Sequence, residues 1–391
     1  MELLTCPIRT YAWGSRSVIA QLQGRPVPSD GPEAELWMGA HPGSSSMVQR
    51  DGDPVSLAEL IDAAPREWLG ADVVARFGPR LPYLLKVLAA QTPLSLQAHP
   101  DAEQARQGYA VETAGGGDGQ RNYADPHHKP ELLVAVTPFE ALCGFQDPRL
   151  SAAAFEAFGV PALDPVIAVL RTGVAGLRTA VHALLTSPAE DRAALVAAVV
   201  AAEPPARFAT QATLARRLAK EYPGDSGVLV ALLLNHVVLN PGEAIWMPAG
   251  NLHAYVHGAG VEIMAASDNV LRGGLTPKRV DVPELLRVLR FEVMPDPVVR
   301  SVQVSPGVRT WPVPVEDFAL HQLRLDAAVP RVRLSVAGPR LVFCLSGAIS
   351  VDDGTRAVTI PAGCAAVGVP SETPLTISGD GEAYVASVGL R

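Results

Sequence analysis

The chain has 391 residues, which is too long for one ordinary domain and fits two or three. It is 48% hydrophobic and only 18% charged, a composition typical of a compact protein with a large core. The net charge of −8 argues against nucleic-acid binding, which depends on basic patches.

The N-terminus and the cysteines indicate the cellular compartment. The first residues, MELLTCPIRTYAWGS, contain no charged segment followed by a long apolar core, so we expect no signal peptide. Asn235 and His236 interrupt the most apolar run, GVLVALLLNHVVL, so we expect no membrane span. The cysteines are scattered without a CxxC pair, at Cys6, Cys143, Cys344 and Cys364. This pattern fits a reducing compartment, and we expect a cytoplasmic enzyme.

The composition changes twice along the chain. Residues 1–145 are rich in Pro, Gly and short apolar runs such as LPYLLKVLAA and PELLVAV, which predicts strands with one or two helices. Residues 146–235 are rich in Ala and Leu at helical spacing, and Ser187-Pro188 predicts the start of one helix. From residue 236 to 391 the pattern of strands and turns returns. We therefore expect a helical insertion at 146–235.

Two further features concern this organisation. The segment IWMPAGNLHAYV at 245–256 resembles VTIPAGCAAVGV at 358–369, with His253 in the first copy and Ala366 in the second. This predicts two related β units, one with a ligand residue and one without. The glycine-rich stretch AGGGDGQ at 114–120 follows no clear strand and opens no clear helix, so it predicts a flexible lid or a linker rather than a phosphate loop.

The stretch TPLSLQAHPD, residues 92–101, places polar residues at every second position. In a strand, Ser95, Gln97 and His99 share one face, while Leu94, Leu96 and Ala98 share the other. The apolar face can pack into a core. The polar face indicates either a hydrogen-bonded pair beside the turn at Pro100, or a site that uses an amide and an imidazole.

A second pattern lies at residues 241–260, PGEAIWMPAGNLHAYVHGAG. Its spacing of Gly, Pro, Gly and His resembles the second half of the cupin signature, with His257 where an Asn usually stands. In this resemblance His253 enters the mouth of a β-barrel from a fixed strand position. The QAH of residues 97–99 then stands for the His-x-His pair of the first half, with Gln97 in place of the first His.

Glu131 completes a group of four candidate metal ligands. It begins the apolar run in NYADPHHKPELLVAV, residues 122–136, where a carboxylate is costly unless it is paired or bound to a metal. The alternative is an ion pair with Lys129. The candidate ligands are Gln97, His99, Glu131 and His253. A set of nitrogen and oxygen ligands without thiolate favours a catalytic metal, and zinc, iron, manganese and cobalt all suit it.

The segment GVEIMAASDNVLRGGLTPK, residues 260–278, closely resembles the signature of the type I mannose-6-phosphate isomerases, which are zinc-dependent cupin enzymes. SLQAHPD, NYADPHHKPEL and GNLHAY resemble three further blocks of that family in the same order, and YAWGS and ELWMGAHPGSSS fit as well. The resemblance spans most of residues 1–300 and is weak over the helical insertion and beyond residue 300. His127 departs from it, because many relatives carry Asn there.

The resemblance implies one zinc ion per chain, held by Gln97, His99, Glu131 and His253. It implies Arg272 as a catalytic residue and a pocket bordered by Trp13. The other residues that it places in the pocket are Ser95, Lys129, Tyr255, Glu262, Asp268 and Lys278. It also implies the reversible conversion of mannose 6-phosphate to fructose 6-phosphate, so the expected partner is a small sugar phosphate.

Aldose–ketose isomerisation passes through an enediolate, so fixed positive charge near the substrate oxygens lowers the barrier. Arg272 suits this role, and Lys129 or Lys278 is expected to hold the phosphate. A base is needed at C2, for which we favour Glu262, with Lys278 or a zinc-bound water as alternatives. Glu262 has a second interpretation, as an orienting partner of Arg272.

We therefore predict a mainly β protein with cupin-type jelly rolls. Residues 1–145 with 236–300 form the catalytic, metal-bearing jelly roll, residues 146–235 the helical insertion, and residues 301–391 a degenerate jelly roll without ligands. Two other functions stay open, an Fe(II) cupin oxygenase and a sugar-phosphate-binding or regulatory cupin without turnover. We expect a monomer, although the oligomeric state and an exchange of strands between the terminal segments are left open.

Overall fold

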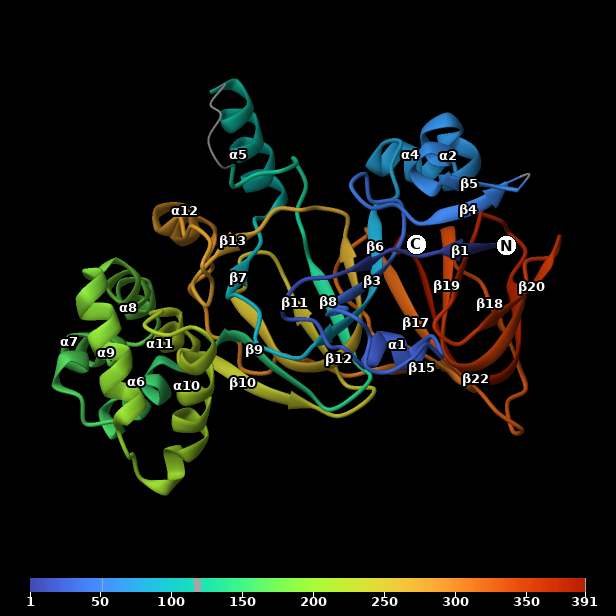
Figure 1. Cartoon of the computed structure of the whole chain (residues 1–391). Coiled ribbons are helices and arrows are strands. Elements are labelled where there is room, and N and C mark those ends of the chain that lie inside the picture. The colour runs from blue at the N-terminus through green and yellow to red at the C-terminus, as the bar shows by residue number, and fades with distance from the viewer. Residues whose placement is uncertain (51, 116–120, 391) are drawn as a thin grey trace.

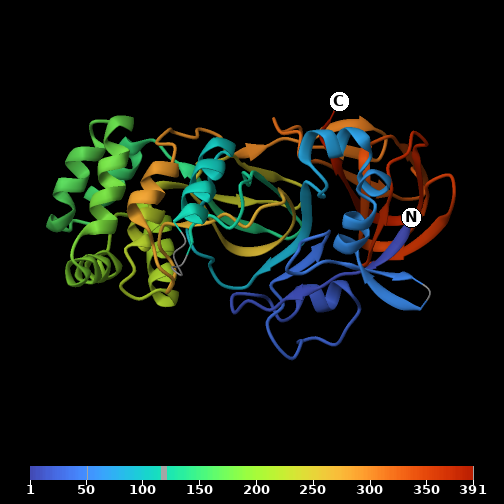
Figure 2. The same cartoon turned by 90° about the horizontal axis from the view of Figure 1, so that it is seen from above.

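The computed structural model of the chain describes residues 1–50, 52–115 and 121–390. The molecule is elongated, with a bundle of helices at one end and β-sheets in the middle and at the other end (Figure 1). The view from above shows the helices and the sheets in the same order along the molecule (Figure 2). No helix in these ranges is both long and apolar enough to cross a membrane. Of the glycine-rich stretch 114–120, residues 116–120 lie outside the described residues.

The first sheet has eleven strands and contains the candidate metal ligands Gln97, Glu131 and His253. Its longest strand, β12 (His253–Ala265), pairs with β6 (Tyr83–Ala90), β7 (Gln97–Ala98), β8 (Glu131–Ala135) and β9 (Phe139–Phe145). The other strands are β2 (Ile8–Arg9), β3 (Glu35–Met38), β10 (Leu234–Leu239), β11 (Ala244–Met247), β13 (Leu271–Arg272) and β14 (Val298–Val299). Strand β7 has only two residues, so the predicted strand through Ser95 and His99 is shorter than expected.

The second sheet also has eleven strands and combines the two ends of the chain. Its C-terminal strands are β15 (Val302–Ser305), β16 (Val308–Thr310), β17 (Ala319–Leu325), β18 (Arg331–Leu334), β19 (Ala337–Asp352), β20 (Ala357–Pro361), β21 (Ala365–Gly368) and β22 (Leu375–Val388). Three N-terminal strands join them: β1 (Glu2–Thr5), β4 (Met47–Arg50) and β5 (Asp53–Ser56). In Figure 1, β1 accordingly lies beside the orange and red strands. The exchange of strands that the sequence left open therefore occurs.

The helices gather mainly between β9 and β10. They are α6 (Pro148–Ala157), α7 (Asp164–Leu170), α8 (Val174–Thr186), α9 (Ala189–Ala201), α10 (Ala209–Glu221) and α11 (Gly227–Ala231), with 3-10 turns at Pro161–Leu163 and Ala206–Phe208. Helix α6 begins as its sequence suggests, because Asp147 accepts a hydrogen bond from the backbone of Arg149 and Pro148 is the first helical residue. Pro188 instead stands one position before α9, as its N-cap.

The remaining helices lie outside this stretch of the chain, and all of them except α5 are short. They are α1 (Val18–Leu22), α2 (Leu57–Ala63), α3 (Pro65–Leu69), α4 (Ala71–Phe77), α5 (Ala102–Ala114) and α12 (Val282–Val288). Helix α5 follows β7 directly and is fixed by a capping box, in which Asp101 and Gln104 bind each other's backbone N–H groups.

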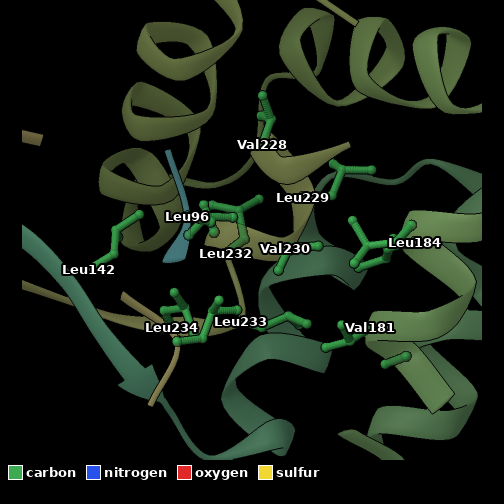
Figure 3. Packing of buried hydrophobic residues seen from close by; sticks show 14 of the residues in the cluster. Leu96, Leu142, Val181, Leu184, Val228, Leu229, Val230, Leu232, Leu233 and Leu234 are labelled. Carbon is green, nitrogen blue, oxygen red and sulfur yellow. The ribbon is translucent and has the colours of Figure 1, made fainter. Parts of the chain in front are cut away.

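Side-chain alternation along the strands decides which face becomes core. One face of the first sheet packs against the second sheet through a single buried apolar cluster, which includes Leu36, Val87, Leu132, Ile263, Phe343 and Tyr384. A second cluster joins the helices to the ends of β7, β12 and β13, and Figure 3 shows Leu96 of this region among the leucines and valines around α11. The opposite face of the first sheet is therefore left for polar residues.

This architecture confirms the predicted fold class, a mainly β protein of cupin type with an α-helical insertion. The predicted domain boundaries stay a prediction. The two sheets do not correspond to two continuous segments of the chain, because the segment before residue 60 supplies strands to both of them.

Candidate metal centre and active site

Three buried side chains on the polar face of the first sheet form a candidate metal site. One ligand atom from each of His99, Glu131 and His253 lies within 4.8 Å of the others. Nε2 of His99 is 3.4 Å from Oε1 of Glu131, and Nε2 of His253 is 3.3 Å from Oε2. Three different segments meet here, the residue after β7 and the first residues of β8 and β12. Two imidazoles and a carboxylate around one point make a typical site for a divalent metal.

Backbone carbonyl groups fix the orientation of both imidazoles. Nδ1 of His99 lies 2.7 Å from the carbonyl oxygen of Asn269, and Nδ1 of His253 lies 3.2 Å from that of Asn251. Each Nδ1–H therefore donates outward, which leaves Nε2 as a lone-pair donor directed into the site. Nε2 of His99 is buried and has no hydrogen-bond partner among the described residues. A bound metal ion would satisfy this nitrogen, so the residues present fit one.

The charges of the site favour the protonation states that bind a metal. Burial, followed by the charge of Lys129, lowers the pKa of His99 to about 4, so its ring is neutral at neutral pH. Burial opposes ionisation of Glu131, but the Lys129 ammonium, 3.1 Å away, together with His99 and His253 outweighs this effect and holds the pKa of Glu131 well below its usual range. The ion pair of Lys129 and Glu131 was the alternative to a metal site at Glu131, and the structure contains both the ion pair and the cluster of candidate ligands.

Gln97 and Arg272 lie in register with the candidate ligand His253. Gln97 pairs with His253 of β12 on one side and with Arg272 of β13 on the other. Residues directly opposite each other in a sheet point to the same face, so the three side chains form one row. Arg272 is half-buried and has no ion-pair partner within the described ranges. Burial lowers its pKa, which stays far above neutral for a guanidinium, so an uncompensated cation lies beside the site.

A second group of charges lies on the same face, farther along β12. Ile263 is fully buried in the core between the sheets, and Glu262 therefore points to the polar face, as predicted. The hydroxyl of Tyr255 donates a hydrogen bond of 2.5 Å to Oε1 of Glu262. Burial, then the charge of Glu131, raises the pKa of Glu262, while Lys86 opposes the rise.

Lys86 is the functional candidate that the sequence analysis missed. It lies opposite Glu262 on β6, and its Nζ is 3.4 Å from carboxylate oxygens of both Glu262 and Glu35. Burial acts to lower the pKa of Lys86, but the two carboxylates outweigh burial and raise it, so the ammonium stays charged. A signal was available, because a lone lysine within the apolar run YLLKVLAA is costly unless its charge is compensated.

The other predicted pocket residues differ in their burial and in their contacts. Trp13 packs against the buried cluster that contains Tyr255, and Ser95 is half-buried two residues before Gln97. Asp268 is more exposed and forms a 2.9 Å hydrogen bond with Nε2 of His41, and both residues line a cavity of about 640 Å³. Lys278 is exposed, and none of the described hydrogen bonds or ion pairs joins its side chain to the site.

Comparisons with known proteins agree with this geometry. Residues 1–148 match the family model of the phosphomannose isomerase type I catalytic domain. The chain is 41% identical to mannose-6-phosphate isomerase of Escherichia coli over 332 residues, which cover 83% of this chain and 84% of that protein. It is 33% identical to mannose-6-phosphate isomerase of Bos taurus over 358 residues, 83% of this chain and 82% of that one.

Solved structures extend the similarity to the whole fold. A zinc-bound structure of mannose 6-phosphate isomerase superposes with a TM-score of 0.90 at 35% identity, covering 100% of this chain and 99% of that one. An arginine-to-alanine mutant of phosphomannose isomerase from Salmonella typhimurium superposes with a TM-score of 0.91 at 35% identity, covering both chains completely. From its sequence, its fold and its cluster of two histidines and a glutamate, this chain belongs to the type I phosphomannose isomerase family.

Proposed function

We propose that the protein catalyses the reversible isomerisation of mannose 6-phosphate and fructose 6-phosphate with the help of one zinc ion. The observation that carries this proposal is the buried cluster of His99, Glu131 and His253, which lies on the same sheet face as Glu262 and Lys86. Membership of the phosphomannose isomerase family supports the same reaction. The expectations of a cytoplasmic location and of a monomer rest on the sequence alone and stay predictions.

Gln97, His99, Glu131 and His253 are the residues that would hold the zinc ion. Their set of nitrogen and oxygen ligands suits a catalytic rather than a structural site, because structural zinc sites are usually rich in cysteine. When bound, zinc supplies Lewis-acid polarisation of the substrate oxygens. The neutral state of His99 and the ionised state of Glu131 favour binding at neutral pH.

In the proposed mechanism Glu262 moves the proton between the two carbons. Its carboxylate removes the proton from C2 of the open-chain aldose and delivers it to C1, while the hydroxyl proton of O2 is transferred to O1, so that no net proton is gained or lost. The Tyr255 hydroxyl and the Lys86 ammonium hold this carboxylate in place. A raised pKa strengthens Glu262 as a base, and the charge of Lys86 opposes the rise and so favours the ionised form.

Cationic side chains stabilise the negative charge that develops in the reaction. Arg272, in the same row as Gln97, offers a planar group of donors to the enediolate oxygens. We propose Lys129 and Lys278 as the candidates for binding the phosphate, with Ser95, Asp268 and Trp13 lining the pocket. The exposure of Lys278 is compatible with contact to a distant phosphate and less so with the role of a base at C2.

The proposal is tested by measuring the conversion of mannose 6-phosphate to fructose 6-phosphate with purified protein. The measurement is made on the protein as isolated, after treatment with a chelator, and after zinc is added back. We expect activity to disappear with the chelator and to return with zinc. A zinc-loaded, folded protein without turnover would refute the isomerase and favour a sugar-phosphate-binding protein, whose affinity calorimetry would then measure.

A further inference from the structure

The loop that follows Arg272 is held on one side by the strand of Gln97. The backbone N–H of Gly273 donates to the carbonyl of Leu96 at 2.8 Å, and the N–H of Leu96 donates to the carbonyl of Gly274 at 3.0 Å. These bonds continue the pairing of Arg272 with Gln97. The backbone around Arg272 is therefore tied to the candidate metal site.

On its other side the loop is held by the helical insertion, through one carboxylate. Oδ2 of Asp225 accepts a hydrogen bond from the N–H of Thr276 at 3.0 Å. Its Oδ1 accepts one from the N–H of Gly227, the first residue of α11, at 2.7 Å. One side chain thus joins two segments that lie 51 residues apart in the chain. Hydrogen bonds to an ionised acceptor are stronger than those between neutral groups.

The backbones of the two segments also touch directly. A Cβ atom at Gly227 would lie 2.5 Å from the backbone nitrogen of Leu275, and a Cβ atom at Gly274 would lie 2.5 Å from Cα of Gly227. Neither position has room for a side chain. The contact between the insertion and the loop therefore requires glycine on both sides.

Leu275 shows that this contact imposes a backbone conformation on the loop. Its φ is +55°, and among the described residues no other residue besides glycines has a positive φ. A residue with a side chain disfavours this conformation for steric reasons. Such a residue persists only where its surroundings over-determine it. Leu275 is 1% exposed and belongs to the buried cluster that includes Val228 and Leu229 of α11. Figure 3 shows those two side chains in this cluster.

We infer that Asp225 is a positioning residue for Arg272, and that the helical insertion acts through it on the chemistry of the active site. This inference rests on the proposed isomerase function. Asp225 lies outside the reacting centre and has no contact with the three clustered metal-site residues among the described hydrogen bonds and ion pairs. The Asp225 carboxylate fixes the backbone of Thr276. This contact helps to keep Leu275, the preceding residue, in its unfavourable conformation. The loop then holds Arg272 in register with Gln97.

The first test compares Asp225→Ala with Asp147→Ala. Asp147 is also an aspartate of the insertion whose side chain accepts a backbone hydrogen bond, but only from Arg149 at the start of α6. We expect Asp225→Ala to lower kcat by about tenfold or more, the effect of losing one charge-assisted hydrogen bond, with a smaller change in KM and full metal content. Asp147→Ala is expected to retain wild-type kinetics. Equal kinetics of Asp225→Ala and the wild type would overturn the inference.

A double-mutant cycle separates positioning of Arg272 from a general loss of structure. If Asp225 acts through Arg272, then Asp225→Ala combined with Arg272→Ala loses no more activity than Arg272→Ala alone. Additive losses would overturn the inference. Asp225→Asn gives the same comparison if the alanine variant does not fold, because the amide retains one acceptor oxygen, and an intermediate kcat is expected. Turnover by the wild type is measured alongside, and its absence would refute the proposed function instead.

Discussion

Lys86 and Glu262 lie directly opposite each other on adjacent antiparallel strands, and Nζ of the lysine is 3.4 Å from Oε2 of the glutamate. Glu35, one strand further, lies 3.4 Å from the same nitrogen. All three side chains are buried. Removing one member of a buried ion pair typically costs about 3–5 kcal/mol, because it leaves an uncompensated charge in the interior. Lys86 therefore controls how readily the proposed base ionises.

Replacing Lys86 by Met is expected to raise the pKa of Glu262 further, since the charge of Lys86 opposes its rise more than the hydrogen bond from Tyr255 does. The proposed base must be ionised, so activity is lost as the pH falls through this pKa. The acid limb of the pH profile of kcat/KM is thus expected to move to higher pH in Lys86→Met. Lys86→Arg keeps the charge and serves as the control. An acid limb that does not move in a folded Lys86→Met protein would argue against Glu262 as the base.

Metal binding and catalysis are expected to separate in two other variants. His253→Ala removes one of the three clustered ligand atoms, so we expect loss of both metal and activity. Arg272→Ala leaves that cluster intact, so we expect full zinc content with turnover reduced by at least about 100-fold, the range seen when one transition-state contact is removed. Elemental analysis together with steady-state kinetics measures both quantities. Loss of metal in Arg272→Ala would mean that the proposed division of roles is wrong.

Lys278 allows a test of how the phosphate is bound. Its exposed position favours a contact with the phosphate over a role at C2. We expect Lys278→Ala to raise KM by roughly tenfold while kcat changes little, as for a contact made equally in the ground and transition states. The neighbouring Arg279, exposed and paired with Asp281, provides a matched control in Arg279→Ala. A large fall in kcat for Lys278→Ala would instead return it to the list of candidate bases.

The attachment of the insertion to the sheet is expected to depend on pH. Glu140 of β9 accepts hydrogen bonds from Nε2 of His236, at 2.8 Å, and from Arg217 of α10. The bond from His236 is the main cause of a lowered pKa for Glu140, with burial opposing it. The pKa of Glu140 is lower in the folded than in the unfolded state, where a glutamate has a pKa of about 4.3. Ionised Glu140 therefore stabilises the fold at pH values above about 4.3, and this contribution is lost as the pH falls from there through the lower pKa of the folded state.

Glu140→Gln is therefore expected to lower the free energy of unfolding at pH 7 by about 1.5 kcal/mol, the scale of a hydrogen bond to a charged group. The difference from the wild type should shrink as the pH falls below about 4. Thermal melts of both proteins across this range measure it. Glu203→Gln, which loses a largely exposed partner of Arg216, is the control and should change stability little. A difference independent of pH would contradict the assignment to Glu140.

The periodic spacing of apolar residues was enough to predict those features of the fold that depend on a single helix or strand. The helical spacing of the insertion predicted helices where α6 to α11 occur, and the alternation of Glu262 with Ile263 predicted which side chain faces the site. Both follow from the geometry of a single element. The short strand β7 was predicted longer than it is: Pro100 and the capping box of Asp101 end it before His99, and residues 94–96 before it are not part of a strand.

Relationships between distant strands could not be predicted in the same way. The alternation around Glu131 indicated a buried carboxylate, but not that His99 and His253 converge on its two oxygens. Lys86 was missed because its partners Glu35 and Glu262 come from two other strands, and only the order of strands in the sheet brings them together. The family resemblance supplied the ligand set that the residue patterns alone left open.

The position of β1 between β21 and β4 has a consequence for synthesis on the ribosome. Glu2 pairs with Val367, which is synthesised much later, so the backbone hydrogen bonds of β1 are complete only after β21 has been made. During translation the edge of β4 and β5 is available to other chains, a known hazard for aggregation. A nascent chain shortened before β21 therefore loses more than its C-terminal strands, because the N-terminal ones lose their place in a sheet as well.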